Sequence, residues 1–173
     1  MPAEPIHKAI LSLGSNISDR AGWLTQAAEA ISGLPSTRIT ARSSIYETEA
    51  VDVPAEFREQ AFLNAVLIVE TALTAKQLSK VVHQIEDQLQ RTRDIPNQPR
   101  TIDIDIITFD NLVSDDKELT LPHPRTHLRR FVLQPLSEIE PKFILPDQSE
   151  TVSELLCKLP TPHSVKLNTE QWS

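Results

Sequence analysis

Two aspartates, Asp103 and Asp105, stand on either side of one isoleucine in the stretch IDIDIITF at 102–109. Because side chains alternate between the two faces of a strand, the isoleucines would face one way and both aspartates the other. Their Cα atoms would then lie about 6.6–6.8 Å apart, so the two carboxylates could converge on one cation. Hard oxygen ligands suit Mg²⁺, which keeps several waters and takes further ligands from substrate phosphates. A DxD pattern alone more often marks the solvent-facing side of a strand, so the interpretation depends on its neighbours.

Three arginines, Arg91, Arg93 and Arg100, precede the aspartate pair in an irregular segment that contains two prolines. Guanidinium groups bind phosphate oxygens two at a time and stay charged. Arginines next to paired carboxylates suit a metal–triphosphate site, because the carboxylates hold the metal and the arginines hold the remaining oxygens. The alternative, that these arginines only balance acidic side chains on the surface, has equal weight when the arginines are taken alone.

Other residues could bind a flat substrate or its phosphates. Phe62 and Asn64 lie two apart in a strand-like stretch, so a ring for stacking and an amide for hydrogen bonding share one face. His123 lies between two prolines that stiffen its backbone, and it could donate to a phosphate oxygen. Arg129 and Phe131 follow and add charge and a second ring. Taken alone, Phe62 is better explained as a core residue, and His123 as an ordinary surface histidine.

The hydrophobic pattern predicts the elements that would hold these residues. Up to residue 109 the order is strand, helix, strand, strand, helix and strand, as in the ferredoxin-like βαββαβ fold. We therefore expect an α+β sandwich, in which an antiparallel sheet carries both helices on one face and a C-terminal extension follows. The predicted strands are 8–13, 37–46, 62–70 and 102–109, and a turn at Gly14-Ser15-Asn16 ends the first of them. The helices follow Ser18 or Asp19 and the Thr74–Gln77 capping box. A loop or hairpin follows residue 109, short apolar pieces lie within 129–140, and a last helix covers 151–158.

Composition limits the class of protein. The chain of 173 residues carries 17 basic and 24 acidic side chains and a net charge of −7. An acidic chain is poorly matched to long nucleic acid, and no apolar run approaches the roughly 20 residues that span a bilayer. The single cysteine excludes an intrachain disulfide. We expect one cytoplasmic domain over residues 1–173 with a peripheral tail at about 160–173, and neither a nucleic-acid nor a membrane partner.

Together these stretches resemble the family of 6-hydroxymethyl-7,8-dihydropterin pyrophosphokinases over nearly the whole chain. Each stretch alone is a weak or moderate signal, but their number, order and spacing are difficult to produce by chance. They are Leu13-Gly14-Ser15-Asn16, Tyr46-Glu47-Thr48-Glu49, Phe62-Leu63-Asn64-Ala65-Val66, Glu86 with Arg91-Thr92-Arg93, PRTIDIDI at 99–106, LPHPR at 121–125 and RRFVLQPL at 129–136.

The resemblance implies transfer of a diphosphate from ATP to the hydroxymethyl oxygen of a reduced pterin, with release of AMP, in folate biosynthesis. It implies that Asp103 and Asp105 hold two Mg²⁺ ions and form the catalytic group with the three arginines. The residues implied to contact ATP are Glu86, Arg91, Arg93, Arg100, Ile106, His123 and Arg129. The residues implied to contact the pterin are Thr48, Val51, Phe62, Asn64 and Phe131, with the two phenylalanines on either side of the ring.

The chain departs from the family pattern after Thr48, where Glu49 replaces a small residue or proline and Asp52 a frequent glycine, and in the loop before Arg100. Gln90 and Gln98 stand where the family usually has glycine, and Asn97 stands where it often has an aromatic or basic residue. This loop is expected to close over the substrates, so the departures bear on its closure and on the rate. None of them removes a predicted metal ligand.

Three alternatives stay open from the sequence. Another Mg²⁺-dependent phosphotransferase or nucleotidyltransferase would explain the aspartates and arginines, but not Phe62, Asn64 and Phe131. A non-catalytic ligand-binding module of the same fold would make the charged cluster a coincidence. An RNA-binding domain would need a basic surface and more exposed aromatics than this chain offers, with aromatics at 5%. We expect a monomer whose partners are ATP and the reduced pterin, with other folate-pathway enzymes as further possible partners.

Overall fold

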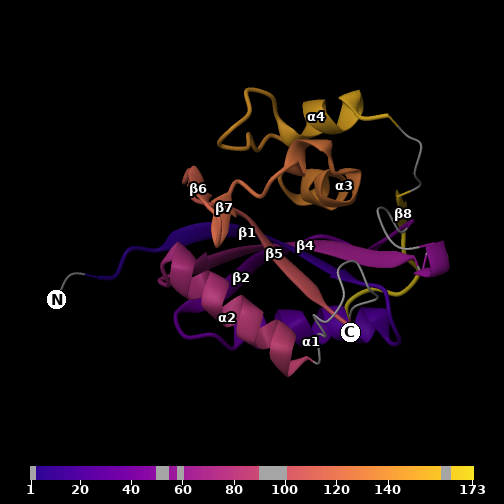
Figure 1. Ribbon diagram of the computed structural model, residues 1–173, viewed down its shortest axis with the longest axis horizontal. Helices are drawn as coiled ribbons and strands as arrows, with labels where there is room; N and C mark the ends of the chain where they lie inside the picture. The colour runs from indigo at the N-terminus through magenta and orange to yellow at the C-terminus, as the bar shows by residue number, and fades with distance from the viewer. Residues whose placement is uncertain (1–2, 50–54, 58–60, 90–100, 161–164) are drawn as a thin grey trace.

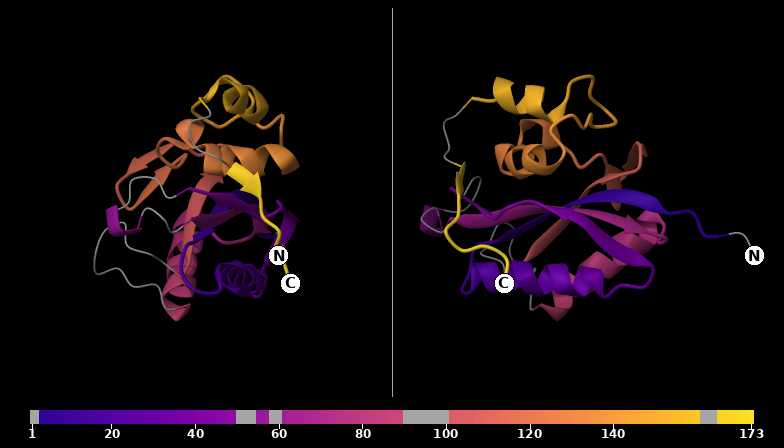
Figure 2. Two further views of the ribbon diagram at one scale, coloured as in Figure 1. Left: turned by 90° about the vertical axis from the view of Figure 1, so that its right-hand side faces the viewer. Right: turned by 180° about the vertical axis from the view of Figure 1, so that it is seen from behind.

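The computed structural model describes residues 3–49, 55–57, 61–89, 101–160 and 165–173. Within these ranges a six-stranded sheet lies between helices on both sides (Figure 1). Helices α1 (Arg20–Ser32) and α2 (Ala75–Gln88) cover one face. On the opposite face lies α3 (Arg130–Ile139), with α4 (Val152–Lys158) stacked on it (Figure 2).

The sheet is antiparallel at every pairing, and its order is β5-β1-β4-β3-β8, with β2 also paired to β4. When β2 and β3 are counted as one interrupted strand, this order is that of the ferredoxin-like fold, so the predicted fold class is confirmed. The strands are β1 (His7–Ser15), β2 (Thr37–Arg42), β3 (Tyr46–Thr48), β4 (Phe62–Thr71), β5 (Asp103–Phe109) and β8 (Val165–Leu167), and a separate hairpin is formed by β6 (Ser114–Asp116) and β7 (Leu119–Leu121).

The two helices on the first face begin where the sequence predicts. The Asp19 side chain caps α1 by accepting the Gly22 N–H at 3.0 Å. Thr74 and Gln77 form the predicted capping box at the start of α2. Both helices bury an apolar stripe against the sheet, so the helix positions follow from capping and from the periodicity of apolar residues.

The central strands are buried on both faces, and their alternation divides the core in two. In β1, Leu11 and Leu13 pack toward α1 and α2, whereas Ile10 packs toward α3 and α4. In β4, Leu67 and Val66 divide in the same way. Because both faces are apolar along most of these strands, a polar side chain on either face stands out as a feature that needs an explanation.

The stretch predicted as one strand over 37–46 is divided. β2 ends at Arg42 and β3 begins at Tyr46, with an irregular segment at 43–45 between them. There, Ser43 donates its backbone N–H to the Val66 carbonyl at 2.9 Å, and its hydroxyl accepts the Val66 N–H at 2.9 Å. A side chain therefore continues the ladder where the backbone departs from it, which a propensity pattern does not reveal.

Three further features differ from the predicted elements. Gly14 was expected in a turn, but it lies inside β1. A helix, α3, covers 130–139 although Pro135 lies within it, whereas the sequence predicts only short apolar pieces there. Residues 165–173, expected in a peripheral tail, pair with β3 through β8. None of the helices in the described part of the chain is both long and apolar enough to span a bilayer.

Candidate active site

The two aspartates lie on the α3 side of β5, as the alternation predicts. Ile104 and Ile106 are 3% and 5% exposed and pack into the core formed with α1 and α2. Asp103 and Asp105 alternate with them and are only partly buried, so both carboxylates point toward the opposite face. The sheet register then decides which side chains meet them on that face.

A row of residues crosses four strands at the level of Asp103. Asp103 pairs with Gly14 of β1, and Gly14 pairs with Asn64 of β4. Asn64 pairs in turn with Tyr46 of β3. The register therefore brings a predicted metal ligand and a predicted pterin ligand to the same face, with one glycine between them.

Because Gly14 has no side chain, the side chains of Asn64 and Phe62 can lie close to its backbone. A Cβ atom placed on it would lie 3.1 Å from the Asn64 Oδ1 and 3.8 Å from Cδ1 of the Phe62 ring. The first distance is tighter than ordinary van der Waals contact, so any larger residue would push the Asn64 amide out of place. A glycine in the middle of a strand marks such close approaches, and here it explains the Gly14-Ser15-Asn16 stretch better than a turn does.

Asn64 and Thr48 are joined directly. The Asn64 Nδ2 donates to the Thr48 hydroxyl at 2.7 Å, and the two side chains are 4% and 6% exposed. Thr48 pairs with Phe62 in the register of β3 with β4. Three of the predicted pterin contacts are therefore adjacent, and the hydrogen bond fixes the orientation of the Asn64 amide.

A second line of side chains leads from Asp105 to α3. The His123 Nε2 lies 3.8 Å from Asp105 Oδ1, and the Arg129 guanidinium lies 3.4 Å from His123 Nδ1. The Arg129 guanidinium also stands over the Phe131 ring at 5.7 Å from its centroid. The structure thus brings His123, Arg129 and Phe131, which follow β5 in the sequence, into one line with Asp105, with cationic and aromatic groups beside its carboxylate.

A β-bulge positions His123. Leu11 pairs with Ile106 and Ile10 pairs with Thr108, so Ile107 is the extra residue in β5. The Ile107 carbonyl accepts the His123 backbone N–H at 2.8 Å. Bulges are common beside active sites, where they redirect the chain, and this one attaches the histidine loop to the strand that carries the aspartates.

Glu86 of α2 supports the aspartate strand from its outer edge. Its side chain is fully buried, and Oε1 accepts the Ile104 backbone N–H at 2.7 Å. Ile104 is the residue between the two aspartates, and β5 is the last strand on that side of the sheet. Glu86 is predicted to contact ATP; the structure shows a buried contact with the backbone of the strand that carries both aspartates.

A cavity of about 370 Å³ lies next to Asp105 and His123, between α2, β5 and the β6–β7 hairpin. The residues of α2 and of the hairpin that line it are not among the predicted site residues. Only the fold brings them to β5, so no local pattern in the sequence could have pointed to them. The lining includes Ser79, Val82, His83, Ile104, Ile106, Lys117, Glu118, Leu119, Thr120 and Pro124.

Several predicted site residues lie outside the described residues. These are Arg91, Arg93 and Arg100 of the phosphate-binding prediction and Val51 of the pterin prediction. The departures from the family pattern at Asp52, Gln90, Asn97 and Gln98 lie there too.

The donor set fits magnesium. In the described part of the chain no group of three or more His, Cys, Asp or Glu side chains is arranged to hold a metal ion. Two carboxylates on one face are nevertheless sufficient for Mg²⁺, which completes its octahedron with water and substrate phosphates. Zn²⁺ would need three or four protein ligands. Asp103 and Asp105 therefore suit a metal that arrives with a nucleotide.

Tyr46 is held at the end of the polar row by Glu138 of α3. Its hydroxyl donates to Glu138 Oε2 at 2.6 Å, while Oε1 accepts both the backbone N–H and the hydroxyl of Ser44 at 2.9 Å. Burial, and then the hydrogen bond and negative charge of Glu138, raise the pKa of Tyr46 from 10.0 to about 12. Glu138 thus ties α3, which carries Phe131, to the strand that carries Thr48.

A ferredoxin-like sheet with paired aspartates, a histidine and an arginine on one face has the arrangement of a phosphoryl-transfer enzyme. The sequence model described as "7,8-dihydro-6-hydroxymethylpterin-pyrophosphokinase (HPPK)" matches residues 10–141. The chain belongs to this family, which confirms the resemblance found in the sequence.

Individual relatives agree with this membership. The chain is 40% identical over 152 residues to the 2-amino-4-hydroxy-6-hydroxymethyldihydropteridine pyrophosphokinase of Methylorubrum extorquens, which covers 88% of this chain and 93% of the relative. It is 41% identical over 132 residues to the enzyme of the same name from Bacillus subtilis, with 76% and 77% covered. In fold it is similar to the HPPK-DHPS of Plasmodium falciparum, with a TM-score of 0.67 and 17% identity over 91% of this chain and 43% of that one.

Tyr46 is the only tyrosine, so its ionisation can be followed alone by absorbance at 295 nm. We expect no phenolate signal near pH 10 and a midpoint near pH 12 in the folded protein. Because the folded pKa lies above the unfolded value, this contact stabilises the fold below about pH 10, and the stabilisation is lost as the pH rises toward 12. Glu138→Gln should lower the midpoint, and the guanidinium-unfolded chain, which titrates near 10, is the reference. A folded wild-type midpoint near 10 would contradict the assignment.

Proposed function

We propose that this chain transfers a diphosphate group from ATP to the hydroxymethyl oxygen of 6-hydroxymethyl-7,8-dihydropterin in folate biosynthesis. The observation that carries the proposal is the polar row on the α3 face, where Asp103 and Asn64 lie on either side of Gly14. A metal–nucleotide end and a heterocycle end are then adjacent, as transfer between two bound substrates requires. Family membership over residues 10–141 supports the same reaction.

The chemistry is a displacement at the β-phosphorus of ATP. The hydroxymethyl oxygen forms a bond to that phosphorus while the bond from it to the oxygen shared with the α-phosphate breaks. AMP leaves with that oxygen, and the hydroxyl proton is released to solvent. Phosphoryl transfer asks the protein mainly for in-line positioning and for neutralisation of charge, so no residue has to act as a nucleophile.

The proposed metal site is formed by Asp103 and Asp105, with two Mg²⁺ ions. Bound there, Mg²⁺ would neutralise charge on the triphosphate and on the attacking oxygen. The partial exposure of both carboxylates supports this role, because water and phosphate oxygens must reach the remaining coordination positions. Glu86 would act through the backbone of Ile104, keeping the two carboxylates at a fixed spacing.

ATP is proposed to lie along the outer edge of β5, with its base in the cavity between α2 and the hairpin. Ile104 directs its N–H outward to Glu86, and Ile106, two residues on, presents its amide and carbonyl at the same edge. An adenine edge offers a matching donor and acceptor. His123 and Arg129, together with Arg91, Arg93 and Arg100, would hold the phosphate oxygens.

The pterin is proposed to lie over Gly14, between the rings of Phe62 and Phe131. Asn64 would bond the edge of the pyrimidine ring, with backbone near Thr48 and Val51 completing the contacts. The hydrogen bond from Asn64 to Thr48 supports this role, since it leaves the Asn64 carbonyl oxygen facing Gly14.

The single domain, the monomeric state, the cytoplasmic location and the number of metal ions stay predictions.

Product analysis tests the reaction directly. Incubated with ATP, Mg²⁺ and the hydroxymethyl dihydropterin, the protein should give AMP and a pterin diphosphate in equal amounts by phosphorus NMR. Omission of the pterin is the control and should give neither product. ADP as the sole nucleotide product would instead indicate an ordinary kinase.

Removing either carboxylate tests the metal site. Asp103→Ala and Asp105→Ala should each lower kcat by at least about 100-fold, because several kcal/mol of charge stabilisation depend on the metal. Asp147→Ala, at an exposed position in the loop before α4, is the matched control and should keep wild-type turnover. Circular dichroism and thermal unfolding would show whether the variants stay folded. Wild-type turnover in either site variant would remove the metal role.

A further inference from the structure

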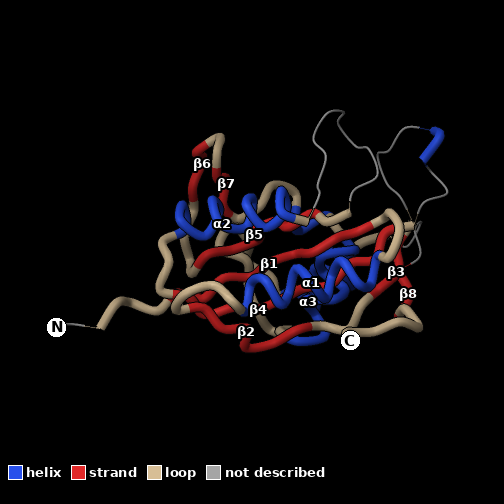
Figure 3. Tube along the Cα trace, turned by 90° about the horizontal axis from the view of Figure 1, so that it is seen from below, coloured by secondary structure: helices blue, strands red, loops and turns tan. Residues whose placement is uncertain are grey.

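The last residues of the chain run along the outside of the strand that carries Thr48. Strand β8 pairs with β3 in the register Tyr46 with Leu167 and Thr48 with Val165. The two strands lie side by side at the end of the sheet farthest from β5 (Figure 3). β3 has only three residues, so β8 covers an edge that would otherwise be open. The family match ends at residue 141 and does not include this segment.

The segment before β3 depends on the same tail for its backbone hydrogen bonds. The Ser43 carbonyl accepts the Trp172 indole N–H at 2.7 Å. The Ile45 N–H donates to the Gln171 Oε1 at 2.8 Å, and the Ile45 carbonyl accepts both the Asn168 backbone N–H at 2.9 Å and the Gln171 Nε2 at 3.1 Å. Buried backbone groups need such partners, and here side chains of the tail supply bonds that a regular strand would supply.

The other backbone groups of this segment are bonded within the sheet and to α3. The Ser43 N–H donates to Val66, the Ser44 N–H donates to Glu138, and the Ser44 carbonyl accepts the Ser43 hydroxyl at 2.8 Å. All six backbone N–H and carbonyl groups of residues 43–45 thus have hydrogen-bond partners, and the tail provides the partners of three of them. Without the tail, the Ile45 groups and the Ser43 carbonyl would lose these bonds next to the fully buried Ile45 side chain.

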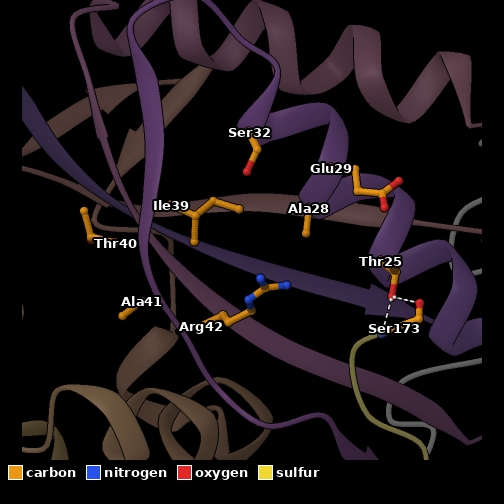
Figure 4. A pocket seen from close by; sticks show the side chains of 9 residues that line it. All are labelled: Thr25, Ala28, Glu29, Ser32, Ile39, Thr40, Ala41, Arg42 and Ser173. Atoms are coloured by element: carbon orange, nitrogen blue, oxygen red, sulfur yellow. Dashed lines mark hydrogen bonds between the residues drawn. The ribbon is translucent and has the colours of Figure 1, made fainter.

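The end of the tail is itself anchored on the body of the domain. The Trp172 ring lies under the Arg42 guanidinium, 5.6 Å from its centroid. Ser173 donates its hydroxyl to Thr25 Oγ1 of α1 at 3.2 Å, at one side of a cavity between α1 and β2 (Figure 4). The tail therefore connects α1 and β2 to the start of β3.

We propose that residues 165–173 position the pterin-binding end of the active site. The tail holds Ile45 and the outer edge of β3, β3 holds Thr48, and Thr48 orients the Asn64 amide. The contacts of the tail are with β3, with the segment before it, and with Arg42 and Thr25, so the tail acts through the positions of Thr48 and Asn64. This inference rests on the proposed function and adds a positioning element to it. The aspartate strand lies at the other end of the sheet, so ATP binding is not affected.

Steady-state kinetics of tail variants test the inference. Gln171→Ala removes both side-chain bonds to Ile45, and Trp172→Phe keeps an aromatic ring near Arg42 while it removes the indole N–H together with part of the ring system. Each should lower kcat/KM for the pterin by roughly threefold to tenfold, which corresponds to one or two lost hydrogen bonds. The KM for ATP should stay within about twofold of wild type. Thr169→Ala, at an exposed position of the same tail, is the matched control and should change neither value.

A purely structural role would give a different result. Parallel changes in the pterin and ATP constants, or a lower Tm with both constants unchanged, would overturn the inference. Pterin diphosphate formation by the wild-type chain is measured first. This measurement distinguishes failure of the proposed reaction from failure of the positioning role alone. If the wild type forms no pterin diphosphate, the proposed function fails and the inference with it. If the wild type is active and Gln171→Ala keeps its pterin constants, only the positioning role is lost.

Discussion

The register of β5, β1 and β4 is the constraint on which the site depends. Because side chains alternate along a strand, a shift of β5 by one residue would turn both aspartates into the apolar core under α1 and α2. The register is fixed by burial, since Ile104 and Ile106 fill that core. At the outer edge of the sheet, Glu86 also fixes the register, because it accepts a hydrogen bond from the backbone N–H of Ile104, the residue between the aspartates. The apolar contacts that stabilise the sheet therefore also place the carboxylates of Asp103 and Asp105 on the opposite face.

The opposite face of the sheet has an apolar part, which packs on α3 and α4, and a polar part, which carries the proposed site. At the level of Ile10 and Val66 it packs against α3 and α4. Further along the same strands the apolar residues give way to Gly14, Asn64 and Asp103. α3 serves both parts, because its apolar side, with Phe131, packs on the core while Glu138 near its end bonds Tyr46 of the polar row. The site is thus the polar continuation of a sheet that is tightly packed elsewhere, which favours a preorganised geometry.

Local patterns in the sequence predicted much of this arrangement. The alternation in IDIDI placed the aspartates, the spacing of Phe62 and Asn64 placed them on one face, and the capping box placed α2. The features that the sequence did not predict depend on contacts formed only in the folded chain. The bulge at Ile107, the burial of Glu86 and the close approach of Asn64 to Gly14 each depend on a partner far away in the sequence. α3 was missed because Pro135 disfavours a helix locally, and its packing on the sheet outweighs that preference.

The central claim is that the carboxylates of Asp103 and Asp105 together form the metal site of a nucleotide complex. Crystals grown with Mn²⁺ and a non-hydrolysable ATP analogue would test it by anomalous scattering. The account predicts anomalous peaks at ligand distance, about 2 Å, from both carboxylates and from the analogue's phosphate oxygens. Manganese bound to the analogue with neither aspartate in its coordination shell would contradict it.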